Sequence, residues 1–490
     1  MTDAPSRGVD LVAQARAAML DKGFLPDFAP AVLAEVAQVV AAQGTAQVKA
    51  GVEDLRGLLW SSIDNDDSLD LDQIEVAEAQ ADGTTLVRVA IADVDGSVRA
   101  HGAIDAHAAA NTTSVYTGVT VFTMLPQPLS YDATSLKQDV DRPAVVISFR
   151  VHPDGTLDGE RVSRALVRNR AKLAYSGLAD WLGGKASVPE RVSKVPGLQA
   201  QLELQNRATS ALRARRVAMG ALDLDTIEAN PVMSNGQVVD LALTVDSRSR
   251  QLIEDLMVAA NGVMARFLAA QKRSGIARVV KVPKRWDRIV ELAAGLGTSL
   301  PKAPDSVALE KFLLAQRAKD SLHFPDLSLA VVKLLGPGEY DLQRAGAPRV
   351  GHFGLAVEDY THSTAPNRRF SDLVTQRLVK AALDGQPPPY SDADLQGVAA
   401  RCTQMEDGAR NVERLLRKMA AAVLLQRRIG QLFDGVVTGV SESGTFARLL
   451  SPPAEGRVVR GAKGLDVGDR VRLKLLATDP TKGFIDFAQA

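Results

Sequence analysis

The chain has 490 residues, of which 46% are hydrophobic and 24% are charged, and its formal net charge is zero at pH 7. This length allows two or three domains with a large core, and the composition is that of an ordinary soluble protein. The single cysteine, Cys402, excludes an intramolecular disulfide and argues against a cysteine-based zinc site. Residues 1–72 hold 12 acidic and 5 basic side chains, so the acidity is concentrated at the front of the chain.

No segment of the sequence indicates a membrane or secretory protein. The N-terminus lacks the apolar core of a signal peptide, and no apolar run approaches the ~18 residues of a membrane span. We therefore expect a cytoplasmic protein with no membrane partner. Arginine clusters could line a phosphate-binding track, although each one alone is more often a solvated helix face. They lie at 207–216, 273–288, 368–369 and 410–428.

Residues 1–50 predict a small helical module made of two short helices, 9–22 and 30–43. Pro30 suits the first turn of the second helix, and Gly44 follows its end. The pair could form a helix-turn-helix-like unit that helps to hold nucleic acid, or it could simply cap the main domain.

Residues 51–430 mix strand-like and helical patterns, and we interpret them as one large α+β domain. The strand-like runs lie at 74–79, 85–94, 144–152 and 157–172. Residues 111–130 predict a packed loop, and helices alternate with loops from about 173 to 430. The clearest long helix is predicted over 247–270.

Residues 431–490 predict a small barrel of the OB-fold type, because five short strands fall within this segment. The strands are expected at 435–440, 445–450, 457–460, 470–476 and 484–487. Such barrels commonly hold single-stranded nucleic acid by base stacking and backbone charge. Phe446, Arg448, Arg457 and Arg460 could serve this purpose, with a core position for the aromatic residue as the equal alternative.

The most informative stretch is an aspartate cluster interleaved with apolar residues. Its members are Asp64, Asp66, Asp67, Asp70 and Asp72. Because partly buried carboxylates repel one another unless a cation neutralises them, and because hard cations prefer oxygen ligands, the cluster predicts a site for Mg²⁺, Mn²⁺ or Ca²⁺. A solvated acidic loop is the simpler alternative.

A calcium loop is a third interpretation of the same stretch. Its acidic and serine residues from Asp64 to Glu75 follow the ligand spacing of the helix–loop–helix calcium motif. However, Leu69 occupies the position that requires glycine, and strand-like residues around the Asp82-Gly83 hairpin signal follow the loop. The calcium loop is therefore the minor interpretation.

A second informative stretch runs from 351 to 373. Two adjacent arginines, Arg368 and Arg369, follow Pro366 and lead into a helix predicted over 373–383. Their planar guanidinium groups suit bidentate contacts with phosphate. His352 and His362 are expected to be structural hydrogen-bonding residues, since a hard-cation site does not require them.

Together these motifs resemble the RNase II/RNase R family of 3′→5′ exoribonucleases, which share the RNB catalytic domain. The Asp-x5-Asp-x-Asp core of that family matches Asp64, Asp70 and Asp72, and the loop that carries its base-stacking tyrosine matches 113–130. Its phosphate-binding region matches the Thr-x-Pro-x-Arg-Arg stretch at 364–369. The motifs occur in the expected order, and the C-terminal segment resembles the family's OB-fold.

The resemblance implies a metal-dependent enzyme that hydrolyses single-stranded RNA from its 3′ end to nucleoside 5′-monophosphates, expected as a monomer. Mg²⁺ is the implied cofactor, with Mn²⁺ as the alternative. The implied metal ligands are Asp64, Asp70, Asp72 and Gln73, and the implied catalytic residues are Asp70, Asp72 and Arg368. The implied RNA-binding residues are Tyr116, which would stack on the terminal base, Arg368, Arg369, and Glu406 near the 3′ end.

The sequence also departs from the family pattern. Gln73 stands where a fourth aspartate is usual, and a carboxamide can ligate a cation but brings no negative charge. We expect weaker metal binding or slower chemistry, with an RNA-binding relative of little hydrolytic activity as the alternative function. Ala365 and Gln376 replace a customary serine and histidine, and the helical module would take the place of the paired cold-shock barrels.

Overall fold

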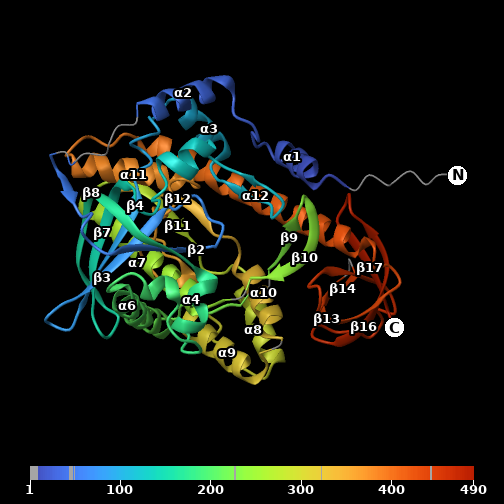
Figure 1. Ribbon diagram of the computed structural model, residues 1–490. Helices are drawn as coiled ribbons and strands as arrows, with labels where there is room; N and C mark the ends of the chain where they lie inside the picture. The colour runs from blue at the N-terminus through green and yellow to red at the C-terminus, as the bar shows by residue number, and fades with distance from the viewer. Residues whose placement is uncertain are drawn as a thin grey trace.

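The computed structural model describes residues 9–42, 48, 50–225, 228–244, 246–321, 323–441 and 444–490. It consists of a large body of helices and strands and a smaller C-terminal barrel. The long helix α12 (Asp392–Gln426) leads from the body into the barrel (Figure 1). The α+β class predicted from the sequence is confirmed. None of the helices in these ranges is both long and apolar enough to cross a lipid bilayer.

A six-stranded sheet forms the centre of the body, with the strand order β1-β8-β2-β3-β4-β7. Its strands are β1 (Val52–Asp54), β2 (Trp60–Asp64), β3 (Gln73–Ala79), β4 (Thr85–Ala92), β7 (Asp141–Val151) and β8 (Leu157–Ala174). Residues 157–168 of the 18-residue β8 pair with β7, and residues 169–174 run parallel to β2. The pairing therefore closes on itself, and the strands predicted in this region are confirmed.

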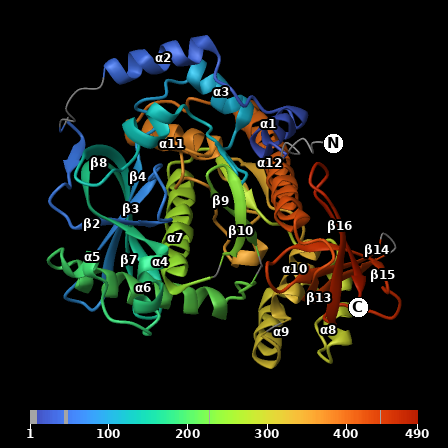
Figure 2. The same cartoon turned by 45° about the vertical axis from the view of Figure 1, so that its right-hand side comes forward.

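Two long helices cover one side of this sheet. The helices α6 (Leu198–Ala218) and α7 (Arg248–Ala270) pack against each other, and both contact β7 (Figure 2). The Ser247 hydroxyl accepts a hydrogen bond from the N–H of Arg250 and so caps the start of α7. The predicted helix over 247–270 is confirmed. The short helices α4 (Tyr175–Leu182) and α5 (Glu190–Ser193) lie beside β8.

The two N-terminal helices pack on different parts of the body. Helix α1 (Leu11–Asp21) lies on α12, where its buried residues join those of the long helix. Helix α2 (Pro30–Ala41) lies on α3 (Ala103–Asn111), and its Val32 and Val36 join the main core. Both predicted helices are present, and each uses its apolar face to cover the body.

Residues 173–430 contain two strand pairs in addition to the expected helices. These are β9 (Ala229–Ser234) with β10 (Gln237–Leu243), and β11 (Gly275–Val279) with β12 (Glu339–Gln343). The expectation of helices and loops alone was wrong here. The partner of β11 lies about sixty residues away, and a local pattern cannot reveal such a pairing.

The remaining elements of the body surround the sheet and the hairpins. They are β5 (Val115–Tyr116), β6 (Val121–Phe122), a π-helical turn (Leu129–Ala133), α8 (Trp286–Gly295), α9 (Ser306–Lys319), α10 (Phe324–Leu335), a 3₁₀ turn (Phe353–Leu355) and α11 (Phe370–Leu383). The packed loop expected over 111–130 holds the short β5–β6 hairpin.

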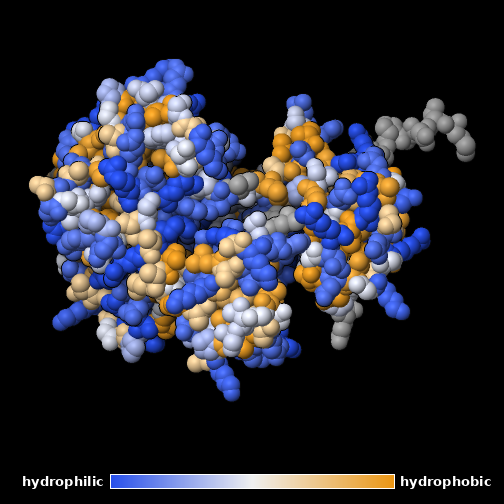
Figure 3. Space-filling model, turned by 90° about the horizontal axis from the view of Figure 1, so that it is seen from below, coloured by the Kyte–Doolittle hydropathy of each residue, from blue (hydrophilic) through white to orange (hydrophobic). Residues whose placement is uncertain are grey.

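The C-terminal segment is a closed five-stranded barrel, as the sequence predicted. Its strands are β13 (Leu432–Ser441), β14 (Gly444–Leu449), β15 (Glu455–Arg460), β16 (Arg470–Asp479) and β17 (Phe484–Gln489). The backbone crosses closely at Gly456, where a Cβ atom would lie 2.5 Å from the carbonyl oxygen of Ile485. Arg448 does not face solvent freely, because its guanidinium donates to Asp326 of α10 at 3.2 Å. Seen from below, the surface is indented between the body and the barrel (Figure 3).

Arg377 of α11 forms hydrogen bonds with residues that follow β4 in the chain. Its buried guanidinium donates to Asp105 at 2.7 Å, to Asp95 at 3.1 Å and to the carbonyl of Val98 at 2.8 Å. Because Arg377→Met would leave the buried Asp105 without its cation, while Asp95 keeps Lys380, we expect the stability of the body to fall by about 3–5 kcal/mol in urea unfolding. The matched Arg472→Met removes an exposed pair with Asp434 and should cost below about 1 kcal/mol. Equal losses in the two variants would contradict this expectation.

Candidate functional site

The aspartate cluster forms the loop between two adjacent strands. Asp64 is the last residue of β2, and Gln73 is the first residue of β3. The Oδ1 atom of Asp64 accepts hydrogen bonds from the N–H of Asn65 at 2.7 Å and from the Ser68 hydroxyl at 3.0 Å. Because strands rather than helices flank this loop, the helix–loop–helix calcium interpretation is wrong.

Asp72 lies at the end of this loop and pairs with a distant arginine. Its carboxylate is 1% exposed, and its Oδ1 accepts the backbone N–H of Asn367 at 3.0 Å. Its Oδ2 accepts the Nε–H of Arg368 at 3.1 Å. The Arg368 side chain is still 43% exposed, and no described residue accepts a hydrogen bond from its Nη atoms. Those Nη atoms can therefore meet an anionic group from outside.

Burial controls the protonation of the neighbouring carboxyls. Desolvation raises the pKa of Asp72 to about 7, although the Arg368 guanidinium lowers it, and the nearby Asp70 adds to the rise. Burial also raises the pKa of Asp70. Ionising both groups together therefore requires positive charge beyond that of Arg368.

Tyr116 of β5 completes the group around Asp70. Its hydroxyl donates to Oδ2 of Asp70 at 3.1 Å, and its backbone N–H donates to Oε1 of Glu413 on α12 at 3.0 Å. The residue is 42% exposed, so part of the ring is open to a flat partner. Burial of the hydroxyl end raises the pKa of Tyr116, and it remains a neutral donor. Sequence reasoning missed Glu413, which carries no motif and is one glutamate among several on a long helix.

The segments of Tyr116 and Arg368 are joined through their backbones. The N–H of Ser114 donates to the carbonyl of Arg368 at 3.0 Å, and Thr113 pairs with Arg369 in an antiparallel bridge. Three sequence segments, the aspartate loop, the Tyr116 hairpin and the start of α11, therefore meet in one place.

Two other residues that the resemblance implied are engaged in internal ion pairs. Arg369 donates to Asp372 at 2.8 Å. Glu406 accepts two hydrogen bonds from Arg278, at 2.6 and 2.9 Å, and so ties α12 to β11. Neither residue forms a hydrogen bond or ion pair with the aspartate loop. The two histidines are hydrogen-bonded within the body, His362 to the Tyr340 hydroxyl at 2.8 Å and His352 to the N–H of Leu355 at 3.2 Å.

Gln73 and Glu75 are two polar residues of β3 whose side chains are buried. Gln73 is 7% exposed. Glu75 is fully buried, and neither of its carboxylate oxygens has a hydrogen-bond partner. Burial raises the pKa of Glu75 well above its ordinary value, and the charge of Asp64 adds to the rise. Sequence analysis placed Glu75 in the calcium motif and within the strand predicted over 74–79, but it did not identify this residue as a buried carboxylate without a partner.

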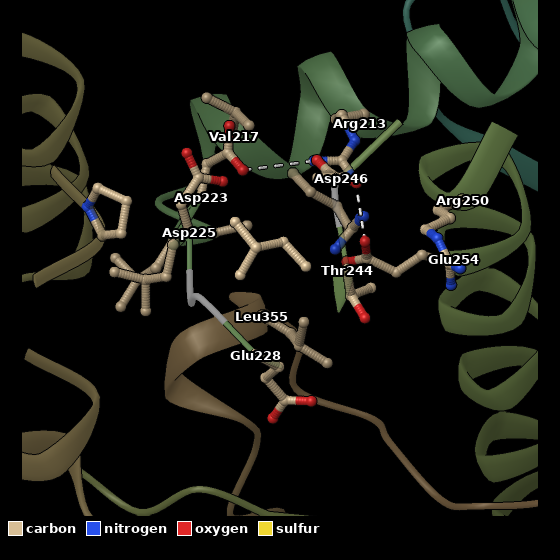
Figure 4. A pocket seen from close by; sticks show the side chains of 16 residues that line it. Arg213, Val217, Asp223, Asp225, Glu228, Thr244, Asp246, Arg250, Glu254 and Leu355 are labelled. Carbon is tan, nitrogen blue, oxygen red and sulfur yellow. Dashed lines mark hydrogen bonds and ion pairs between the residues drawn. The ribbon is translucent and has the colours of Figure 1, made fainter. Parts of the chain in front are cut away.

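A pocket of about 540 Å³ is lined from α6, α7, residues 221–225, Glu228 and the end of β10 (Figure 4). Arg213 in its wall pairs with Glu254 at 3.0 Å and with Asp223 at 3.7 Å. Arg250, also in the wall, donates to Oδ1 of Asn65 in the aspartate loop at 3.0 Å. The arginines that the sequence placed at 207–216 thus include two that are held in internal ion pairs, Arg213 and Arg216, which pairs with Asp255.

The donors at the loop suit a hard divalent cation. They are carboxylate and carboxamide oxygens, the ligands that Mg²⁺ and Mn²⁺ prefer, and the orphaned Glu75 carboxylate lies in the same strand. In the part of the chain that the structure describes, no three His, Cys, Asp or Glu side chains converge as a metal cluster. The aspartates instead hold Ser68, Tyr116 and Arg368 as partners.

The fold and the aspartate loop place the chain in a class of proteins in which a mixed α+β domain is followed by a C-terminal barrel. The RNB domain model matches residues 52–385, and the model of the RNase II-type exonuclease C-terminal S1 domain matches residues 431–490. The chain belongs to the RNB family.

Named relatives agree with this assignment. Ribonuclease R of Vibrio cholerae is 28% identical over 93% of this chain and 59% of its own length. The structure resembles that of Mycoplasma genitalium RNase R in complex with ribose-methylated single-stranded RNA, with a TM-score of 0.86, 24% identity, and coverage of 98% of this chain and 78% of that one. It also resembles yeast Ssd1, a pseudonuclease, with a TM-score of 0.71, 15% identity, and coverage of 94% and 57%. The chain spans a little over half the length of most curated relatives that it matches.

Asp72 should destabilise the metal-free protein at neutral pH. The unfolded carboxyl loses its proton near pH 4, whereas the folded one retains it up to about pH 7, so stability falls as the pH rises through this window. We expect Asp72→Asn in EDTA to have a free energy of unfolding up to about 4 kcal/mol higher than that of wild type at pH 8. The variant should therefore unfold at a higher temperature.

The difference should shrink as the pH is lowered to 4, as thermal melts followed by circular dichroism would show. Asp67→Asn, in the exposed part of the same loop, is the matched control and should not change the melting profile. A lower melting temperature of Asp72→Asn at pH 8 would contradict the expected sign.

Proposed function

We propose that the protein is a metal-dependent 3′→5′ exoribonuclease that hydrolyses single-stranded RNA to nucleoside 5′-monophosphates. The observation that carries the proposal is the pairing of Tyr116 with Asp70 beside the pairing of Arg368 with Asp72. This arrangement puts an open aromatic ring, a partly exposed guanidinium, the buried carboxyl of Asp72 and the partly buried carboxyl of Asp70 in one place. Membership of the RNB family supports the same reaction.

The residues of the chain have separate roles in this proposal. Tyr116 stacks on the terminal base, and its bond to Asp70 fixes the orientation of the ring. The free Nη atoms of Arg368 bind the phosphate, while its Nε bond to Asp72 holds the guanidinium in place. Glu406 and Arg369 are assigned to the path of the RNA only by the resemblance, because both are held in ion pairs.

Asp64, Asp70, Asp72 and Gln73 are the residues that would hold Mg²⁺, with Mn²⁺ as the alternative. A divalent cation in this position would neutralise phosphate charge and lower the pKa of the attacking water. It would also supply the positive charge that lets both Asp70 and Asp72 ionise at neutral pH. The monomeric state and the cytoplasmic location remain predictions.

An RNA-binding relative with little hydrolysis is the second candidate. Gln73 favours it, because this residue contributes no charge where the family pattern has an aspartate. The likeness to Ssd1, a pseudonuclease, indicates that the fold by itself does not decide between the two.

The first test is incubation of a 5′-labelled single-stranded RNA with the purified protein in Mg²⁺ or in EDTA. We expect a ladder that shortens from the 3′ end only in Mg²⁺, nucleoside 5′-monophosphates on thin-layer chromatography, and no ladder with Asp72→Asn. Asp67→Asn should degrade RNA as wild type does, because Asp67 is exposed and outside the paired residues. Intact RNA that still shifts in a binding gel would support the binding-only candidate instead.

Tyr116 offers a test of the stacking role. We expect Tyr116→Ala to weaken binding of a short RNA in EDTA by about 5- to 150-fold, since loss of one base–aromatic stack costs about 1–3 kcal/mol. Tyr116→Phe is the matched control, because it keeps the ring and removes only the hydroxyl bond to Asp70. Fluorescence anisotropy would measure both affinities, and an equal loss in both variants would assign the effect to the hydroxyl.

A further inference from the structure

Glu75 is a buried carboxylate that no interaction of the protein explains. It lies in the middle of the buried run of β3, with no exposed surface. Buried carboxylates are nearly always hydrogen-bonded or paired with a cation, yet both Oε atoms of Glu75 lack a partner. The residue opposite it on β2, Ser61, is also buried and its hydroxyl is likewise unpartnered.

The position of Glu75 relates it to the aspartate loop. Side chains two residues apart in a strand point to the same face, so Glu75 faces the side of β3 that Gln73 faces. Asp64 ends the neighbouring strand β2, and its charge acts on Glu75. Ser61, which pairs with Glu75 across the two strands, lies three residues before Asp64 on β2. Glu75 therefore lies close to both ends of the aspartate loop, two residues from Gln73 on β3.

Hydrogen-bonding competition also distinguishes Glu75 from the aspartates. Asp64, Asp70 and Asp72 each share a carboxylate oxygen with a protein donor, namely Ser68, Tyr116 and Arg368. Neither oxygen of Glu75 has such a partner. A carboxylate two residues beyond Gln73 thus brings back the negative charge that Gln73 lacks.

We propose that Glu75 replaces the missing fourth aspartate as a ligand of the divalent cation in this loop. This inference rests on the proposed function only in assuming that the loop binds Mg²⁺ or Mn²⁺. It predicts that the charge required by the site is supplied by Asp64, Asp70, Asp72 and Glu75, while Gln73 contributes at most a neutral oxygen.

The test measures Mn²⁺ binding to the full chain without RNA, by electron paramagnetic resonance of free Mn²⁺. We expect Glu75→Gln, which keeps the shape and removes the charge, to weaken binding by ~10-fold or more. Adding Gln73→Asp to that variant should restore affinity to within about threefold of wild type. The matched control is Glu78→Gln on the same strand. Glu78 is partly exposed and paired with Arg88, and this variant should bind Mn²⁺ as wild type does.

A second measurement covers the case in which Glu75→Gln does not fold. Anomalous scattering from crystals of the wild-type protein grown with Mn²⁺ should place the metal within coordination distance of a Glu75 oxygen. A metal bound by the aspartates with Glu75 outside its coordination shell would overturn the inference.

The outcomes separate this inference from the proposed function. Wild-type Mn²⁺ affinity in a folded Glu75→Gln variant, together with Mg²⁺-dependent shortening of RNA by the wild-type protein, would overturn only the role of Glu75. A wild-type protein that binds no Mn²⁺ and leaves RNA intact would overturn both. A loss of affinity that Gln73→Asp restores would support the inference even if RNA hydrolysis proved slow.

Discussion

The ion pair between Asp72 and Arg368 is the contact on which the candidate site depends. It joins residues nearly three hundred positions apart. It thereby connects the loop between β2 and β3 to the start of α11. Asp72 is buried and Arg368 is partly exposed, so one partner of the pair is fixed in the protein and the other can be reached from solvent. The arginine can therefore bind an anion from solvent while it keeps its hydrogen bond to Asp72, which pre-organises it for binding.

Much of the fold could be predicted from local patterns, and the reasons are physical. The aspartate loop, the strands on either side of it and the barrel strands depend on alternation and turn residues that lie close together in the chain. The β11–β12 pair and the role of α12 could not be predicted, because they depend on contacts between distant segments. The same limit applies to Glu413, whose bond to Tyr116 spans about three hundred residues.

The candidate site shows a similar division. Asp70, Asp72, Tyr116 and Arg368 were found through motif order, and the structure brings them together. Arg369 and Glu406 came from the same resemblance but lie in ion pairs that a sequence cannot display. Glu75 is the opposite case, because its residue type was visible while its burial and its lack of partners were not. Sequence patterns identified residue types suited to the chemistry, and packing decided which of them are available.

The long helix α12 has a mechanical consequence. Its 35 residues extend for ~52 Å as one continuous rod, which contacts β5 near Tyr116 and reaches the barrel at its far end. Glu413 on this helix accepts a hydrogen bond from the backbone N–H of Tyr116. The C-terminal part of the helix packs against β16 and β17. A rigid strut of this kind sets a constant separation between the barrel and the aromatic ring.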